Sequence, residues 1–505
     1  MTAFAWILVA ALVAAPAADN KDKDKKKPPD KAAPAAITPD ELMRQAEEKA
    51  AAGDLDGAAN LLRKTAALPG ATGEPSLRLG RMLEGKHELD SAIDAYQAAA
   101  AGLSGAGKGE ALARLSILQH LRGVSASMAS AESAVAADPE GAWPASALAM
   151  ARARQGQADE AMTLARKAVA AGGTAPAQTA LGAAQEAAKD LKAAEEAYRA
   201  AGGADAANVA AAVGLARVLR LTRRAAEAEP LLQTVVAASP GAVAAYTESA
   251  RVKMALGRGA DAMADGAVAA ALAEGDPEVA ALAVETAVAR ALDYVAAQQA
   301  DLAVQDLTRL REKHADSVVV RLGLARALIA KRQADAAIVE LQKAVELSPT
   351  SAEAQYQLGL AQHLHKQNAS AAVPSLEKAA AADPVNPDYR ISLGAALVDA
   401  KQYDRAVAEL TPITRSAPDR PEAWIYLGAA NLQAKRYKEA VAALDKAAAL
   451  APKSAQVEAF LAWSYFGLKD ASGFKLHGGK ARALGHKEAT LLQYLTRIEG
   501  GEPIK

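Results

Sequence analysis

The chain has 505 residues and no cysteine, its 58 Lys and Arg nearly balance 59 Asp and Glu, and only 4% of its residues are aromatic. The lack of cysteine excludes disulfides, thiolate catalysis and zinc–thiolate sites. The balanced charge argues against nonspecific nucleic-acid binding, which needs a basic excess. Alanine supplies much of the hydrophobic content. Because alanine is the best helix former, the composition predicts an all-α protein.

The N-terminus carries an apolar run, Thr2–Ala18, that ends in the small-residue pattern Ala15-Pro16-Ala17. A run of this length before such a site is typical of a signal peptide. We therefore expect residues 1–18 to be a signal peptide cleaved near residue 17, and the mature chain to be periplasmic or otherwise extracytoplasmic. The alternative is an uncleaved short anchor, because the basic cluster follows the apolar run at residues 21–27 instead of preceding it. Residues 19–37 are charged and proline-rich, which predicts a disordered linker.

The segment Pro421–Ser454 carries a spaced set of large and small residues. Glycine and alanine stand where two helices would have to cross, larger residues stand around them, and a proline stands where the second helix would have to end. The set is Trp424, Leu427, Gly428, Tyr437, Ala440, Leu444, Ala447 and Pro452. This pattern resembles the tetratricopeptide repeat, a helix-turn-helix unit of 34 residues. The resemblance implies a TPR-type α-solenoid, a right-handed superhelix of helical hairpins.

The same template places about 12 repeats over residues 39–454. Seven repeats form a predicted N-terminal arm, residues 39–283, with starts at 39, 73, 108, 142, 175, 209 and 243. Five form a predicted C-terminal arm, residues 284–454, with starts at 284, 318, 352, 387 and 421. The longer interval between 243 and 284 predicts a long helix over about 277–299, because Pro277 follows Asp276 as at a helix start. Residues 455–505 read as a degenerate repeat and a capping helix.

The sequence matches motifs of catalytic or ligand-binding sites only incompletely. Gly102–Lys108 matches the first part of a phosphate-binding loop, but Gly109 stands where Ser or Thr would hold magnesium, and no strand precedes it. His363 and His365 are two residues apart on a predicted helix and so face different sides. We expect no catalytic, cofactor-binding or metal site and no bound cofactor, and we predict that the protein is not an enzyme.

In the family, the first helix of each repeat lines the concave face, and the resemblance implies a peptide-binding groove there. Arginines recur at one of the groove positions, as Arg81, Arg217, Arg251 and Arg326, with Arg220 one turn after Arg217. The predicted groove is therefore basic in its middle. Guanidinium groups bind carboxylates in a bidentate manner, so an acidic partner segment is expected there. The alternative is that these are ordinary solvated arginines.

Groove positions of the last repeats are apolar instead. They are Tyr356, Leu360, Ile391, Ala395, Val398, Ile425, Tyr426, Ala429 and Leu432. An exposed apolar stripe commonly marks a binding surface, so a helix or extended peptide of a partner is expected on it. The alternatives are packing between neighbouring repeats and a self-association surface.

Together these features predict a noncatalytic scaffold or adaptor that binds other proteins, in the bacterial cell envelope if the N-terminus directs export. Two alternatives remain open at this stage. One is a cytoplasmic or membrane-tethered adaptor with the same surface. The other is a subunit of an envelope biosynthetic, secretion or motility enzyme complex with an unrecognised site. No nucleic acid is expected as a partner, and membrane association is expected only through the N-terminus.

Overall fold

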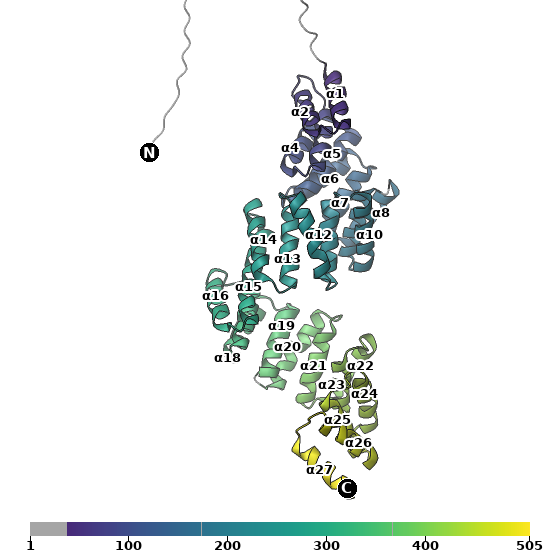
Figure 1. Cartoon of the computed structure of the whole chain (residues 1–505), viewed down its shortest axis with the longest axis vertical. Coiled ribbons are helices and arrows are strands. Elements are labelled where there is room, and N and C mark those ends of the chain that lie inside the picture. The colour runs from purple at the N-terminus through teal and green to yellow at the C-terminus, as the bar shows by residue number, and fades with distance from the viewer. Residues whose placement is uncertain (1–37, 173, 366, 505) are drawn as a thin grey trace, which may run out of the picture. The chain divides into compact units, whose positions relative to one another are not determined.

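The computed structural model describes residues 38–172, 174–365 and 367–504. Within these ranges the chain forms 27 α-helices and one π-helical turn, η1 (Ala361–His365), and no strand (Figure 1). The predicted all-α fold of helical hairpins is thus confirmed. The predicted signal segment and linker, residues 1–37, lie outside the described residues.

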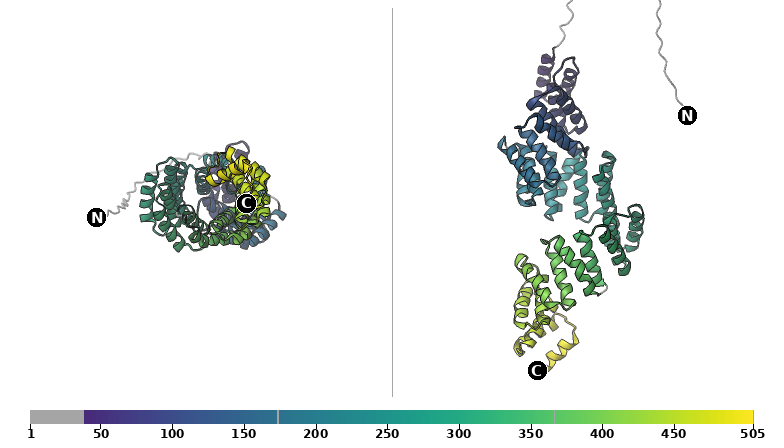
Figure 2. Two further views of the ribbon diagram at one scale, coloured as in Figure 1. Left: turned by 90° about the horizontal axis from the view of Figure 1, so that it is seen from below. Right: turned by 180° about the vertical axis from the view of Figure 1, so that it is seen from behind.

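The chain divides into two compact units. The first ends at Ala71 and contains the hairpin of α1 (Pro39–Ala51) and α2 (Leu55–Ala66). The second starts at Thr72, and its hairpins follow one another in chain order, as the colours in Figure 2 show. Its first helices are α3 (Glu74–Gly85), α4 (Leu89–Gly102), α5 (Gly105–Leu121), α6 (Ser127–Ala137), α7 (Ala142–Arg154), α8 (Ala158–Ala170), α9 (Ala175–Ala187), α10 (Leu191–Ala204), α11 (Val209–Leu221), α12 (Ala225–Ala238), α13 (Val243–Ala255) and α14 (Gly259–Leu272).

The second unit continues with the longest helix, α15, and the hairpins after it. These helices are α15 (Pro277–Ala296), α16 (Ala300–Lys313), α17 (Val318–Ala330), α18 (Ala334–Leu347), α19 (Ala352–Leu360), α20 (Ala369–Ala382), α21 (Pro387–Asp399), α22 (Tyr403–Ser416), α23 (Pro421–Gln433), α24 (Tyr437–Leu450), α25 (Ala455–Gly467), α26 (Ala471–Ala483) and α27 (Ala489–Glu499). Odd-numbered helices up to α25 are the first helices of their hairpins. Most of them start at the residue that the template marks as a repeat start, whereas α5 starts at Gly105 where the template gives 108.

The long helix α15 begins where the sequence suggests. Pro277 occupies its first turn, and the Asp276 side chain caps it by accepting hydrogen bonds from the backbone N–H groups of Glu278 and Val279. A proline is tolerated at this position because the first N–H groups of a helix have no partner within the helix. The two-arm division at 283/284 stays a prediction.

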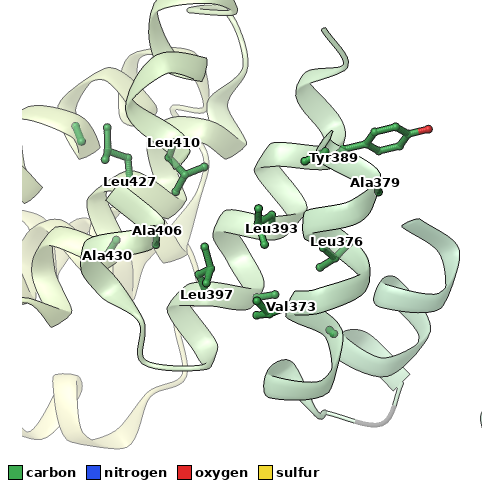
Figure 3. Packing of buried hydrophobic residues seen from close by; sticks show 14 residues of the cluster. Val373, Leu376, Ala379, Tyr389, Leu393, Leu397, Ala406, Leu410, Leu427 and Ala430 are labelled. Carbon is green, nitrogen blue, oxygen red and sulfur yellow. The ribbon is translucent and has the colours of Figure 1, made fainter. Parts of the chain in front are cut away.

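Small residues let the two helices of a hairpin approach closely. A Cβ atom added to Gly428 of α23 would stand 2.5 Å from Cγ of Leu444 on α24, and Gly394 and Gly359 meet Leu410 and Leu376 in the same way. These leucines are fully buried. Figure 3 shows the buried side chains of α20 to α23, where Leu376, Leu393, Leu410 and Leu427 belong to one hydrophobic cluster. The crossing glycines therefore make room for the leucine that fills the hairpin.

Two hairpins of the N-terminal half use tyrosine in place of that leucine. Tyr96 of α4 packs over Gly80 of α3, and its hydroxyl donates to the Glu84 carboxylate at 2.5 Å. Tyr198 of α10 packs over Gly182 and donates to Glu186 at 3.0 Å. Both rings are almost completely buried. The buried hydroxyls need these carboxylates, because a buried polar group without a partner is costly.

The end of the chain forms one more hairpin than the template gives. The glycine-interrupted segment after residue 470 is helical as α26, and α27 covers the hairpin of α25 and α26. Phe474, Leu491 and Leu495 are fully buried in this layer. The helices of the described ranges include none with the length and apolarity of a membrane span.

Candidate functional site

The first helices of successive hairpins, α5 to α15, surround a cavity of about 940 Å³. Its wall contains alanines from three of these helices, Ala151, Ala183 and Ala244, whose short side chains leave the space open. Charged side chains project from the same helices between them. The cavity lies within the second unit.

One side of the cavity is closed because the beginning of the second unit contacts residues more than a hundred positions further along. Arg122 Nη1 donates to the carbonyl oxygen of Gly241 at 3.0 Å. His87 Nδ1 and the Ser239 hydroxyl lie 2.7 Å apart. Gly123 follows Arg122 in the turn after α5, and a Cβ atom there would lie 3.4 Å from the Ala273 Cβ. The turn after α5 therefore packs against the loops on either side of α13 and α14.

Two of the predicted groove arginines share one buried carboxylate. Glu248 of α13 is 1% exposed, and its two oxygens contact Arg217 Nε at 3.4 Å and Arg220 Nε at 2.6 Å. Arg217 Nη1 also lies 3.6 Å from Glu186 on α9. Burial by itself lowers the pKa of Arg217, but the charges of Glu186 and Glu248 outweigh it and hold that pKa above its usual value. These arginines are bound within the wall.

The other predicted arginines differ in their surroundings. Arg251 of α13 lines the cavity with Arg217 and contacts the Glu278 carboxylate at 3.0 Å. Arg81 of α3 pairs with Glu110, its Nε at 2.9 Å. Arg326 of α17 is exposed, does not line this cavity and makes no ion pair with any described residue. The predicted basic stripe is thus largely matched by carboxylates of neighbouring helices. Whether these residues bind a partner stays a prediction.

Two cavity residues were missed by sequence reasoning. Arg154, at the end of α7, is exposed in the cavity wall and makes no ion pair or hydrogen bond with the described part of the chain. Burial nevertheless lowers its pKa; the negative charge of Glu278 opposes this shift, and the positive charge of Arg217 adds to it. Nearby His120 of α5 has a buried Nδ1 without a hydrogen-bond partner among the described residues. Burial, followed by the charges of Arg154 and Arg217, lowers the pKa of His120 to about 3.

The signal for both residues was present in the repeat register. Arg154 and His120 occupy the same position of adjacent repeats, counted from the starts at 142 and 108. That position belongs to the set that faces the groove in the family, but the sequence reading concentrated on the arginine column one turn earlier. Their carboxylate surroundings had no comparable signal.

The apolar groove residues of the last repeats are more buried than expected. Ile391 is 5% exposed and packs with Ile413 and Ala423, and Ala395 and Ala429 are buried as well. The expectation that Ile391 is exposed is therefore wrong, because α22 of its own hairpin and α23 of the next hairpin close over it. The remaining residues are half-buried: Tyr356, Leu360, Val398, Ile425, Tyr426 and Leu432.

The two tyrosines of this set take part in packing between hairpins. The Tyr356 and Tyr389 ring centroids are 4.7 Å apart, and the Tyr356 hydroxyl lies 3.3 Å from the Ser392 hydroxyl. Tyr426 packs against the clusters of α20 to α23, and its burial raises the pKa of its hydroxyl. These positions thus serve contacts between neighbouring repeats, and each keeps only part of its surface open. Their role in binding stays a prediction.

The segments that resemble a phosphate-binding loop or a histidine site have structural roles in the fold. Gly102 ends α4, and Lys108 lies in the first turn of α5, so the loop-like sequence between them joins two hairpins. His363 lies in η1 and contacts the Asp399 carboxylate at 2.7 Å. No group of three or more His, Asp or Glu suited to a metal ion occurs in the described ranges.

The second unit is an α-solenoid, a stack of helical hairpins each of which packs on its neighbours. Residues 325–366 match a family model described as TPR repeat, and residues 391–455 match one described as tetratricopeptide repeat. These two segments are therefore tetratricopeptide repeats, units that typically serve in noncatalytic scaffolds for protein interactions.

The comparison with curated proteins found no match. Among solved structures, similar chains include the TPR protein YrrB, described as having an unusual peptide-binding site (20% identity, 38% of this chain and 97% of that chain, TM-score 0.33). Others are a chain of the APC/C hetero-tetramer Cut9–Hcn1 (14% identity, 91% and 96%, TM-score 0.42) and the type IV pilus biogenesis factor PilW (17% identity, 42% and 98%, TM-score 0.38). We base no functional assignment on these likenesses.

Proposed function

We propose that the protein is a noncatalytic scaffold of the bacterial cell envelope that holds partner polypeptides against the concave helices of its repeats. The observation that carries this proposal is the cavity lined by helices between α5 and α15, into which charged side chains of several repeats project. A concave, preformed site of this size is where a protein ordinarily takes a ligand. Acidic partner segments bind at this cavity, and apolar segments bind toward the last repeats, on the open parts of Tyr356, Leu360 and Leu432.

Site-specific photo-crosslinking in living cells tests the binding face. A photo-reactive residue replaces Ala187, which lines the cavity, and in a matched variant it replaces Arg166, which is exposed on α8 away from the cavity. We expect Ala187 to capture a partner that mass spectrometry identifies and Arg166 to capture little. Capture only from Arg166 would contradict a concave binding site.

The envelope location rests on the apolar segment Thr2–Ala18 and its small-residue end. Fusing a reporter that is active only outside the cytoplasm to the C-terminus tests export, and N-terminal sequencing of the purified protein tests cleavage. We expect an active reporter and a first residue near 18. An inactive reporter would favour a cytoplasmic adaptor, and an intact N-terminus would favour the anchor.

A further inference from the structure

Four cationic side chains line the cavity: Arg154, Lys189, Arg217 and Arg251. Three carboxylates face them, those of Glu186, Asp276 and Glu278. Glu248, beneath the wall, is matched by Arg220 as well as by Arg217. Among the described residues the wall therefore carries one more cation than carboxylate, with His120 neutral.

The carboxylates of the wall are already engaged. Glu186 and Glu278 lie at ion-pair distance from Arg217 and Arg251, 3.6 and 3.0 Å. Asp276 accepts two backbone hydrogen bonds at the start of α15. Neither Arg154 nor Lys189 makes an ion pair with a described residue, so the surplus of positive charge falls on these two.

A guanidinium beside other cations and partly withdrawn from water is stabilised when a carboxylate binds it. Burial is the main reason that the pKa values of Arg154 and His120 are lowered, so both side chains are partly withdrawn from water here. The volume of about 940 Å³ lies at the upper end of the range for ligand pockets, roughly 300–1,000 Å³, and far exceeds that of a lone carboxylate. The site thus has room for several residues of an acidic chain.

We propose that the cavity binds a short acidic polypeptide segment through its side-chain carboxylates, with Arg154 as the principal contact and Lys189 as a second one. This inference rests on the proposed scaffold function and adds which residues contact the acidic segment and how long that segment is. The arginines that the sequence singled out, Arg217 and Arg251, then act mainly as wall structure because their charges are already paired. Closure of the wall by Arg122 and Gly241 favours a short segment.

Ligand-observed NMR with the full-length protein tests the proposal. The probe is an acetylated and amidated Glu-Ala-Glu-Ala-Glu peptide, compared with its Gln counterpart. We expect the Glu peptide to bind and the Gln peptide to bind at least about tenfold more weakly, since charge-assisted hydrogen bonds are lost. Arg154→Gln is expected to weaken the Glu peptide about tenfold. The matched control is Arg166→Gln, another exposed arginine without an ion pair among the described residues, which should change binding less than about twofold.

Several results would overturn the proposal. Equal binding of the Glu peptide by the Arg154→Gln and Arg166→Gln variants would remove Arg154 as the contact. Succinate, or a Gln peptide with a free C-terminal carboxylate, binding as tightly as the Glu peptide would assign the site to a different carboxylate source. If no peptide binds while the photo-reactive residue at 187 still captures a partner, the scaffold function stands and this inference fails. Circular dichroism of each variant confirms that the helices are intact.

Discussion

A methyl group at residue 428 would clash with the Leu444 side chain. The two helices of this hairpin can therefore pack closely only if residue 428 is glycine. We expect Gly428→Ala to destabilise the protein by about 1–3 kcal/mol, the usual effect of overpacking. Gly479→Ala is the matched control, because a Cβ there meets nothing within 4 Å. That substitution should stabilise α26 by about 0.5–1 kcal/mol through helix propensity. Urea unfolding followed by circular dichroism measures both, and a stabilising Gly428→Ala would contradict the packing.

His120 gives a prediction about pH. Its pKa is lowered from 6.5 to about 3 in the folded protein, so between these values the unfolded chain binds a proton that the folded chain does not. This group therefore contributes stability that is present above about pH 6.5 and is lost as the pH falls. The slope approaches about 1.4 kcal/mol per pH unit below the unfolded pKa.

In a His120→Gln variant this contribution is absent. The stability of the variant relative to the unchanged protein should rise as the pH falls from 7 to 5, whatever the constant cost of the substitution. Urea midpoints at several pH values measure the difference. A difference that does not change with pH would show that His120 is not held neutral by burial in the wall.

The roles of some individual residues could be predicted from the sequence, and the roles of others could not. Small residues at helix crossings recur in a fixed register, so Gly394 and Gly428 were identifiable as packing positions from spacing alone. The role of Glu248 could not be predicted. Its partners Arg217 and Arg220 lie on α11, the first helix of the preceding hairpin, and no repeat position pairs a carboxylate with them. Ile391 was misread for a related reason. Its position faces the groove in the repeat template, but Ile413 and Ala423 of neighbouring helices cover it here.

Among the elements, the first helices and α15 were predictable because proline, capping residues and the repeat length mark their starts. The helical state of α26 was not, because its glycines argue against a helix when propensity alone is considered. Packing stabilises α26 as a helix, because Gly478 lies against Leu495 of α27 and Phe474 is fully buried. Tertiary contacts therefore supply what propensity lacks.

The helix α27 covers the last hairpin through Leu491 and Leu495, both fully buried. Replacing both by serine should cost several kcal/mol, since each loss of a buried leucine costs about 2–5 kcal/mol. It should also release Trp463, whose ring lies 5.9 Å from Tyr494, and shift its fluorescence to longer wavelength. Gln493→Ser with Thr496→Ser, on the exposed face of α27, is the control and should leave both readouts unchanged. A normal fluorescence spectrum for the leucine variant would contradict a covering role.

At the scale of the whole second unit, the contacts of Arg122 and His87 with Gly241 and Ser239 decide whether the cavity has a closed wall. Repeat proteins are held mainly by contacts between neighbouring repeats. Contacts across such a long stretch of sequence are therefore not implied by the repeat pattern, and the sequence predicted a concave groove here without them. If the wall opens in solution, a longer partner segment would fit than the one we propose.

An engineered disulfide measures this closure directly, because the chain has no cysteine of its own. A Cβ at Gly123 would lie 3.4 Å from the Ala273 Cβ, close to the roughly 3.5–4.5 Å that a disulfide requires. We expect Gly123→Cys with Ala273→Cys to crosslink under mild oxidation and to migrate faster on a non-reducing gel. Gly156→Cys with Ala273→Cys is the control, because Gly156 occupies the equivalent turn with a similar positive φ and has nothing within 4 Å. If the first pair crosslinks no faster than the second, the wall is open in solution, and the proposal of a short segment falls with it.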